Sequence, residues 1–143
     1  MPYPELMIKP MREELTSLGF LELRTREDVD VFMAQKEGSA LLVINSVCGC
    51  AAGQARPGVR MALSGEVRPD RLATVFAGQD VEAAKAVRGY FADVPPSSPS
   101  FALFNNGELV YFVPRHRIEG RAAEDVAQDL AGAFRRELAP AAS

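Results

Sequence analysis

Two apolar runs in the first half of the chain predict buried strands. Residues 40–46 and 71–77 have apolar side chains at most positions, with no alternation between apolar and polar. Strands of a parallel sheet that is covered on both faces have such continuous runs. Helices are predicted after the two runs, over 51–63 and 81–90. The order strand, helix, strand, helix predicts a parallel strand pair joined by a right-handed crossover.

Apolar residues spaced three and four positions apart predict further helices. Thr25 precedes a segment with this spacing and is expected to cap a helix over 26–36. The same pattern predicts a C-terminal helix over 122–138, after which the tail 139–143 is expected to fray. Residues 3–18 also have a helical pattern.

Capping and helix-breaking residues refine these predictions. Asp80 is expected to cap the helix that starts at position 81. Pro57-Gly58 lies inside the helix predicted over 51–63 and is expected to kink it or end it early. A short strand is predicted at 20–23.

A β-hairpin is predicted in the last third of the chain. The apolar segments 101–104 and 109–113 flank Asn106-Gly107. Asn-Gly is a preferred turn of tight hairpins because both turn residues must adopt positive φ angles. A proline-rich stretch, 95–99, comes just before the first of these strands.

The composition is that of one ordinary globular domain. The chain has 143 residues, of which 48% are hydrophobic, enough for a single core over 1–143. Its 16 basic and 19 acidic residues give a net charge of −3, so no nucleic-acid partner is expected. Residues 1–20 mix charged and apolar positions, unlike a signal peptide, and no run reaches membrane-spanning length. We therefore expect a cytoplasmic protein with no membrane partner.

The two cysteines of the chain, Cys48 and Cys50, lie where the predicted strand gives way to the predicted helix. The unpaired amides and partial positive charge of a helix N-terminus favour a thiolate over a thiol. In the reducing cytosol a close cysteine pair is typical of a catalytic or metal-binding site, not of a permanent cross-link. We therefore predict a dithiol redox centre that needs no cofactor.

The two thiols are expected to have different roles. Disulfide exchange needs an ionised and accessible cysteine, and Cys48, at the start of the turn, is the predicted attacker. Cys50 is expected to be less exposed and to resolve the mixed disulfide formed on Cys48. Alternatively, an external thiol resolves it and Cys50 only tunes Cys48. Gly49 is expected either to let the backbone approach the bound disulfide or to serve only as a turn residue.

The order of the predicted elements resembles that of a thioredoxin-like fold. This α/β fold has three layers, α/β/α, around a mixed sheet with a central parallel part and a C-terminal β-hairpin. In that fold a cis-proline opens the strand next to the active-site cysteines, and Pro99 stands at this place. We predict a cis bond between Ser98 and Pro99, with backbone groups left free to pair with an extended substrate. A rigid loop with no binding role is the alternative.

Several sequence blocks carry a closer resemblance. They are similar to those of the bacilliredoxins, small thioredoxin-like proteins with a Cys-Gly-Cys motif, and comprise residues 10–16, 45–53, 55–57, 75–80, 95–100 and 114–121. The resemblance implies that a cysteine removes a low-molecular-weight thiol, typically bacillithiol, from a mixed disulfide on another protein. Weak disulfide isomerase or reductase activity is also associated with the family.

A basic cluster follows the predicted hairpin. Arg115 and His116 lie beside two further arginines, Arg117 and Arg121. Such a cluster can hold the carboxylates of a thiol such as bacillithiol, or those of an acidic protein. A solvated loop with no binding role is the alternative, because exposed cations are common on protein surfaces.

Three interpretations of the cysteine pair remain open. The first is an oxidoreductase whose partners are S-thiolated proteins and a low-molecular-weight thiol, with a protein disulfide isomerase or reductase as the runner-up. The second is a metal-binding dimer, because zinc needs four ligands and one chain offers only two cysteines and one histidine. The third is a pair of buried, inert core cysteines. We favour the first, with no metal, and the chain as either a monomer or a homodimer.

Overall fold

A five-stranded sheet forms the centre of the molecule. The computed structural model describes residues 3–138, and the strands of its sheet lie in the order β1-β3-β2-β4-β5. Their bounds are β1 Leu21–Glu22, β2 Ser39–Asn45, β3 Arg71–Phe76, β4 Ser100–Asn105 and β5 Glu108–Val113. The first three strands run parallel to one another, and β4 and β5 are antiparallel to their neighbours. The predicted mixed sheet with a parallel part and a C-terminal hairpin is therefore confirmed.

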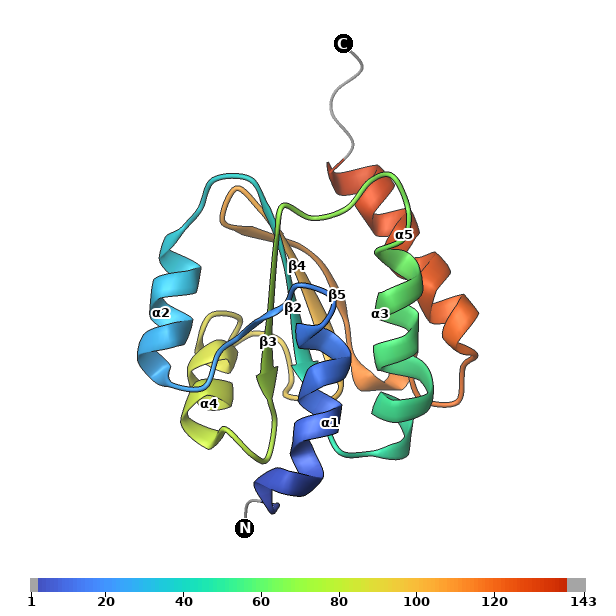
Figure 1. Ribbon diagram of the computed structural model, residues 1–143. Coiled ribbons are helices and arrows are strands. Elements are labelled where there is room, and N and C mark those ends of the chain that lie inside the picture. The colour runs from blue at the N-terminus through green and yellow to red at the C-terminus, as the bar shows by residue number, and fades with distance from the viewer. Residues whose placement is uncertain (1–2, 139–143) are drawn as a thin grey trace.

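Helices cover both faces of this sheet. The helices are α1 Glu5–Thr16, α2 Arg26–Ala34, α3 Arg56–Ala62, α4 Val81–Gly89 and α5 Ala123–Leu138, with a π-helical turn η1 at Ala51–Ala55 and a 3-10 turn η2 at Arg115–Arg117. One face carries α2 and α4, and the other carries α1, α3 and α5 (Figure 1). The three-layer, thioredoxin-like α/β arrangement predicted from the sequence is therefore present. Within residues 3–138 no helix has both the length and the apolar character needed to cross a membrane.

Strand β2 is buried on both sides, which explains its continuous apolar sequence. Leu41 and Val43 pack against the α1, α3 and α5 side of the core. Leu42 and Ile44 point the other way, into the cluster formed with α2 and α4. Because neither face of the strand meets water, polar residues stand only at its two ends, at Ser39 and Asn45.

Pro57-Gly58 does not end the helix early, which was one of the two effects predicted for it. The irregular segment comes before the proline, where the Arg56 amide donates to the Ala51 carbonyl five residues back. Pro57 then lies in the first turn of α3, where its missing N–H costs no hydrogen bond. The helix continues through both residues to Ala62, so Pro57 lies near the start of the regular helix and does not end it.

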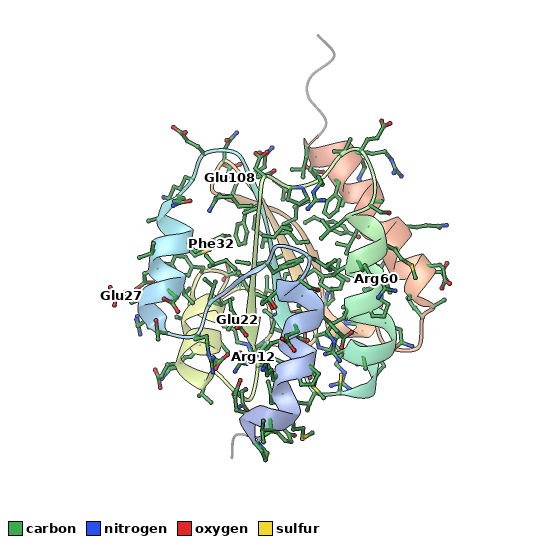
Figure 2. The ribbon with its side chains drawn as sticks, viewed as in Figure 1. Arg12, Glu22, Glu27, Phe32, Arg60 and Glu108 are labelled. Atoms are coloured by element: carbon green, nitrogen blue, oxygen red, sulfur yellow. The ribbon has the colours of Figure 1, made fainter. Side chains whose placement is uncertain are left out.

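Asp80 lies at the predicted helix start, but its side chain does not cap the helix. Its carboxylate instead accepts hydrogen bonds from both terminal nitrogens of Arg12, at 2.6 and 3.0 Å, and the α4 N-terminus has no side-chain cap. Arg12 is almost fully buried and also pairs with Glu5 at 2.7 Å. It pairs with Glu22 as well, at 2.8 Å (Figure 2). The buried cation competes successfully for the carboxylate because its own burial must be compensated.

The other local predictions agree with the structure. Thr25 and Asp28 form a reciprocal capping box at the start of α2. Asn106 and Gly107 have φ angles of 52° and 84°, as the hairpin turn requires. The peptide bond between Ser98 and Pro99 is cis. The expectation that residues 139–143 fray falls outside the residues that the structure describes.

Candidate active site

The two cysteines lie at the edge of the sheet where the parallel strands β2 and β3 end, between β2 and the π-helical turn. Cys48 is half-buried, whereas Cys50 is 8% exposed and stands at the N-cap of η1. Their Sγ atoms are 2.7 Å apart, so the pair needs little movement to close a disulfide. The Ala51 and Ala52 amides donate to the Cys48 carbonyl, which fixes the turn that brings the sulfurs together.

The surroundings give the two thiols opposite acidities. Burial works to raise the pKa of Cys48, but a hydrogen bond from the Cys50 thiol opposes this. Hydrogen bonds from the Ala51 amide and the Ser46 hydroxyl, together with the charge of Arg115, bring this pKa below that of an ordinary thiol. For Cys50, burial and the hydrogen bond to Cys48 raise the pKa to about 11. At neutral pH the proton therefore stays on Cys50, and Cys48 is the thiol that ionises.

Arg115 is the cation that the fold brings to the sulfurs. Its guanidinium donates to Glu119 Oε2 at 3.0 Å and to the Ser98 carbonyl at 3.3 Å, and it remains partly exposed. Its positive charge acts to lower the pKa of both Cys48 and Cys50. For Cys50, burial and the interaction with Cys48 are larger and raise the pKa. Arg115 thus bridges the proline loop and the turn after β5 while facing the thiols.

The cis-proline lies beside the segment that leads to the cysteines. Ser100 pairs with Ile44 across β4 and β2, which places the adjacent Pro99 next to the end of β2. Pro99 is buried and Ser98 is half-buried. The Ser98 carbonyl, expected to be free, accepts the hydrogen bond from Arg115 instead. An extended substrate would have to displace this guanidinium to pair with that carbonyl.

A buried polar network supports the cysteine turn, and the sequence did not predict it. Arg56 Nη1 donates to Asn45 Oδ1 and to the Ser46 carbonyl, both at 2.9 Å, and its Nε donates to Glu14 at 3.0 Å. Ser46 in turn accepts the Cys48 amide on its Oγ at 3.2 Å. The network therefore joins α1, α3 and the end of β2 directly behind the attacking thiol. The only signal in the sequence was that Arg56 lies in the 55–57 block shared with the family.

The remaining predicted site residues, Gly49 and His116, make no contacts that tie them to the thiols among the described residues. Gly49 is exposed between the two cysteines, with nothing within 4 Å of the position that a Cβ would take. His116 is exposed on η2, and no hydrogen bond or ion pair of its imidazole is found within residues 3–138. Arg115, from the same turn, contacts the site, whereas Arg117 and Arg121 pair with Asp129 of α5. The predicted basic cluster therefore brings one residue to the thiols.

A metal centre is not formed by the described part of one chain. Residues 3–138 contain no group of three or more His, Cys, Asp or Glu side chains arranged to hold a metal ion. A site shared between two copies, as in the metal-binding alternative, would have to draw both of its cysteine pairs to one interface.

A cavity of about 580 Å³ lies away from the thiols. It is lined by Leu21 of β1, Val31 and Phe32 of α2 and Arg71 at the start of β3, among others. Because β2 and β3 are parallel, the start of β3 and the end of β2 are at opposite edges of the sheet. The cavity is therefore not part of the cysteine site.

Comparison with known proteins covers nearly the whole chain. The family model described as disulphide isomerase matches residues 3–137. A bacilliredoxin of Salinibacter ruber is 57% identical over 136 residues, which cover 94% of this chain and 80% of that protein. A bacilliredoxin of Geobacillus kaustophilus is 52% identical over 133 residues, covering 92% of each chain.

Solved structures share the fold at low sequence identity. A thioredoxin of Malassezia sympodialis superposes with a TM-score of 0.53 at 12% identity, covering 80% of this chain and 89% of that one. The reduced thioredoxin pre-protein of Schistosoma mansoni gives a TM-score of 0.52 at 17% identity, covering 79% and 95%. The expected thioredoxin-like fold is therefore shown by comparison as well as by topology.

Proposed function

Because the chain belongs to the bacilliredoxin family, we propose that it removes a low-molecular-weight thiol, bacillithiol or a similar one, from protein mixed disulfides. The family and the thioredoxin fold support a thiol–disulfide oxidoreductase. The observation that carries the finer proposal is the contrast between Cys48, half-buried with a lowered pKa, and Cys50, buried with a raised one. In such a pair, the ionised thiol attacks the substrate disulfide and the protonated thiol is available to resolve the intermediate.

In the first step the Cys48 thiolate attacks the sulfur of the small thiol in the mixed disulfide. A new disulfide forms between Cys48 and the small thiol, the old disulfide breaks, and the target protein leaves as a thiolate that takes up a proton. Electrons are conserved, because one disulfide replaces another. The hydrogen bonds that favour the Cys48 thiolate are then no longer needed.

In the second step Cys50 resolves the intermediate. The pKa of Cys50 is raised by burial and by its hydrogen bond to Cys48 and the charge there. The hydrogen bond to Cys48 and the charge on Cys48 are both lost once Cys48 is in a disulfide. The pKa of Cys50 therefore falls, and Cys50 ionises more readily at this stage. Its thiolate attacks Cys48 Sγ, the small thiol leaves with its electron pair, and an external thiol reductant must later reopen the Cys48–Cys50 disulfide.

A trapping experiment tests the first step. The Cys50→Ser variant cannot form the intramolecular disulfide, so bacillithiol taken from a bacillithiolated protein should remain on Cys48. Mass spectrometry of the variant should show one bacillithiol adduct, mapped to the peptide that contains Cys48. The disulfide isomerase, favoured by the description of the matching family model, predicts a different result: no transfer, together with rescue of a scrambled protein by the wild type.

Arg115 is proposed to bind the substrate, with Ser98, Gly49 and His116 offering surface around it. The buried Pro99 is proposed to act through the loop that carries Ser98. The Arg115 guanidinium is partly exposed beside the sulfurs, and the neutral Ser98 carbonyl that it holds can be exchanged for a substrate carboxylate. Charged donors bind carboxylates more strongly than carbonyls, so a thiol that carries carboxylates is favoured.

The Arg115→Gln variant should therefore lose selectivity for acidic thiols. We expect kcat/KM to fall about tenfold for a bacillithiolated protein, and about threefold for the same protein carrying 2-mercaptoethanol, which has no carboxylate. The threefold loss reflects the higher pKa of Cys48 without the nearby cation. Arg117→Gln is the matched control, because that arginine is on the same turn as Arg115 but pairs with Asp129 of α5. Equal losses for both substrates would argue against carboxylate binding by Arg115.

A further inference from the structure

An exposed apolar surface lies at the N-terminal end of α1, on its first turn and on Tyr3 just before it. Tyr3, Leu6 and Met7 are 41%, 89% and 47% exposed, and we call these three residues the α1 patch. The core-facing side of the helix is occupied by other residues, among them Ile8 and Leu15. The patch residues are thus not needed to pack α1 onto the sheet, and water covers apolar groups that would gain free energy from burial.

The α1 patch borders the cysteine-bearing edge of the sheet. Met7, Met11 and Glu14 follow one another at helical spacing and so share one face of α1. The Met11 carbonyl accepts the Asn45 side-chain amide at 3.2 Å, and Glu14 pairs with Arg56 at 3.0 Å, so this face runs along the segments flanking the cysteine turn. The N-terminal turn of α1 extends beyond the sheet at the edge where β2 leads toward α3 (Figure 1).

Hydrogen bonds hold this turn in place. The Tyr3 amide donates to the side-chain oxygen of Gln79 at 2.7 Å, and the Gln79 amide nitrogen donates back to the Tyr3 carbonyl at 2.9 Å. The same nitrogen reaches Glu5 at 3.1 Å. The α1 patch is therefore a preformed surface, and a partner does not have to order it on binding.

We infer that the α1 patch is the docking surface for the protein part of the mixed disulfide, an inference that rests on the proposed function. The reaction brings a second polypeptide within covalent reach of Cys48, and the patch lies on that same edge. A small disulfide occupies only the thiols and Arg115, so contact with Leu6 and Met7 is open only to a larger substrate. The partner that fits carries apolar side chains beside its thiolated cysteine.

The test uses the double variant Leu6→Gln/Met7→Gln. Glutamine is uncharged and a good helix former, so the substitutions remove apolar contact without changing the charge near Cys48. Three substrates are compared: a bacillithiolated synthetic peptide with Leu and Val beside the modified cysteine, the same peptide with Ser and Thr there, and the mixed disulfide of bacillithiol with 2-mercaptoethanol. Val31→Gln is the control, because Val31 is 59% exposed but lines the cavity remote from the thiols.

The double variant should raise KM about tenfold for the apolar peptide, with kcat within about twofold of the wild type. For the polar peptide and the small disulfide, the double variant should have the same KM and kcat as the wild type. The pH profile of Cys48 alkylation should be the same as in the wild type. A substitution that disturbed the cysteine site would shift this profile. Wild-type KM values in the double variant, or the same rise from Val31→Gln, would overturn the docking surface. If the wild type acts on none of the three substrates, it is the proposed function that fails.

Discussion

Cys48→Ser is expected to reduce removal of bacillithiol from a bacillithiolated protein to the uncatalysed background, whereas Cys50→Ser keeps the first step. The attacking species is a thiolate, and a serine hydroxyl is not ionised near neutral pH. Cys48 is also the more exposed residue of the pair. The measurement is single-turnover release of the reduced target, followed by mass spectrometry. A Cys48→Ser variant that still accepts bacillithiol, beside an inactive Cys50→Ser, would reverse the two roles.

The pH dependence of this first step follows from the same arrangement. The thiolate is the reactive form, so the rate should rise with pH as Cys48 ionises and level off above its pKa. Because hydrogen bonds outweigh burial and lower this pKa, the midpoint should fall below that of an unperturbed thiol, about 8.5. Alkylation of the Cys50→Ser variant by iodoacetamide across the pH range reports this midpoint directly.

Two substitutions of Cys50 separate its hydrogen bond from its resolving role. Both Cys50→Ser and Cys50→Ala prevent the intramolecular disulfide, but only serine keeps a donor that can point at Cys48. The alanine variant should raise the pKa of Cys48 and slow its alkylation at neutral pH about tenfold relative to the serine variant, since a hydrogen bond to a charged group is lost. Equal alkylation rates would mean that the Cys50 thiol does not support the Cys48 thiolate.

Local patterns in the sequence were sufficient to predict the fold. Continuous apolar character identified β2 because the strand is covered on both faces, and Asn106-Gly107 identified the hairpin because its φ angles are demanding. The position of the cysteines at the end of β2 was predictable for the same reason. Each of these features is determined by residues that are close together in the chain.

The contacts that were missed, in the fold and in the site, join residues far apart in sequence. Asp80 was predicted as a cap, but Arg12, distant in the chain, takes its carboxylate. The Ser98 carbonyl was predicted to be free, but Arg115 occupies it. Nothing near either arginine in the sequence says which carbonyl or carboxylate will accept its hydrogen bonds, because the partner is fixed only when the elements pack.

Arg56 is the clearest of these long-range residues. Its side chain is 2% exposed, and it reaches three groups on two other elements: Glu14, the Asn45 side chain and the Ser46 carbonyl. Without it, the Ser46 carbonyl would lose its charged donor, and Asn45 Oδ1 would keep only the Ser46 amide, which donates to it at 2.9 Å. Both acceptors lie behind the cysteine turn, and a buried acceptor that loses a charged donor does not regain an equal partner from water.

Arg56→Met should therefore lower the free energy of unfolding by about 3 kcal/mol, from two lost hydrogen bonds to a charged donor at about 1.5 kcal/mol each. Urea denaturation measures this loss. Glu14→Gln is the matched control, because that carboxylate is 43% exposed and its partly solvated ion pair is worth about 1 kcal/mol or less.

The turn itself should also respond to Arg56→Met. Ser46 would lose the bond that fixes its carbonyl, so its hydroxyl would be less well aimed at Cys48, and the pKa of Cys48 should rise. Iodoacetamide alkylation of Cys48 at neutral pH should then be slower in Arg56→Met than in Glu14→Gln. If Arg56→Met destabilises the protein but leaves the alkylation profile unchanged, the network supports the fold alone, and the acidity of Cys48 is set within the cysteine turn and by Arg115.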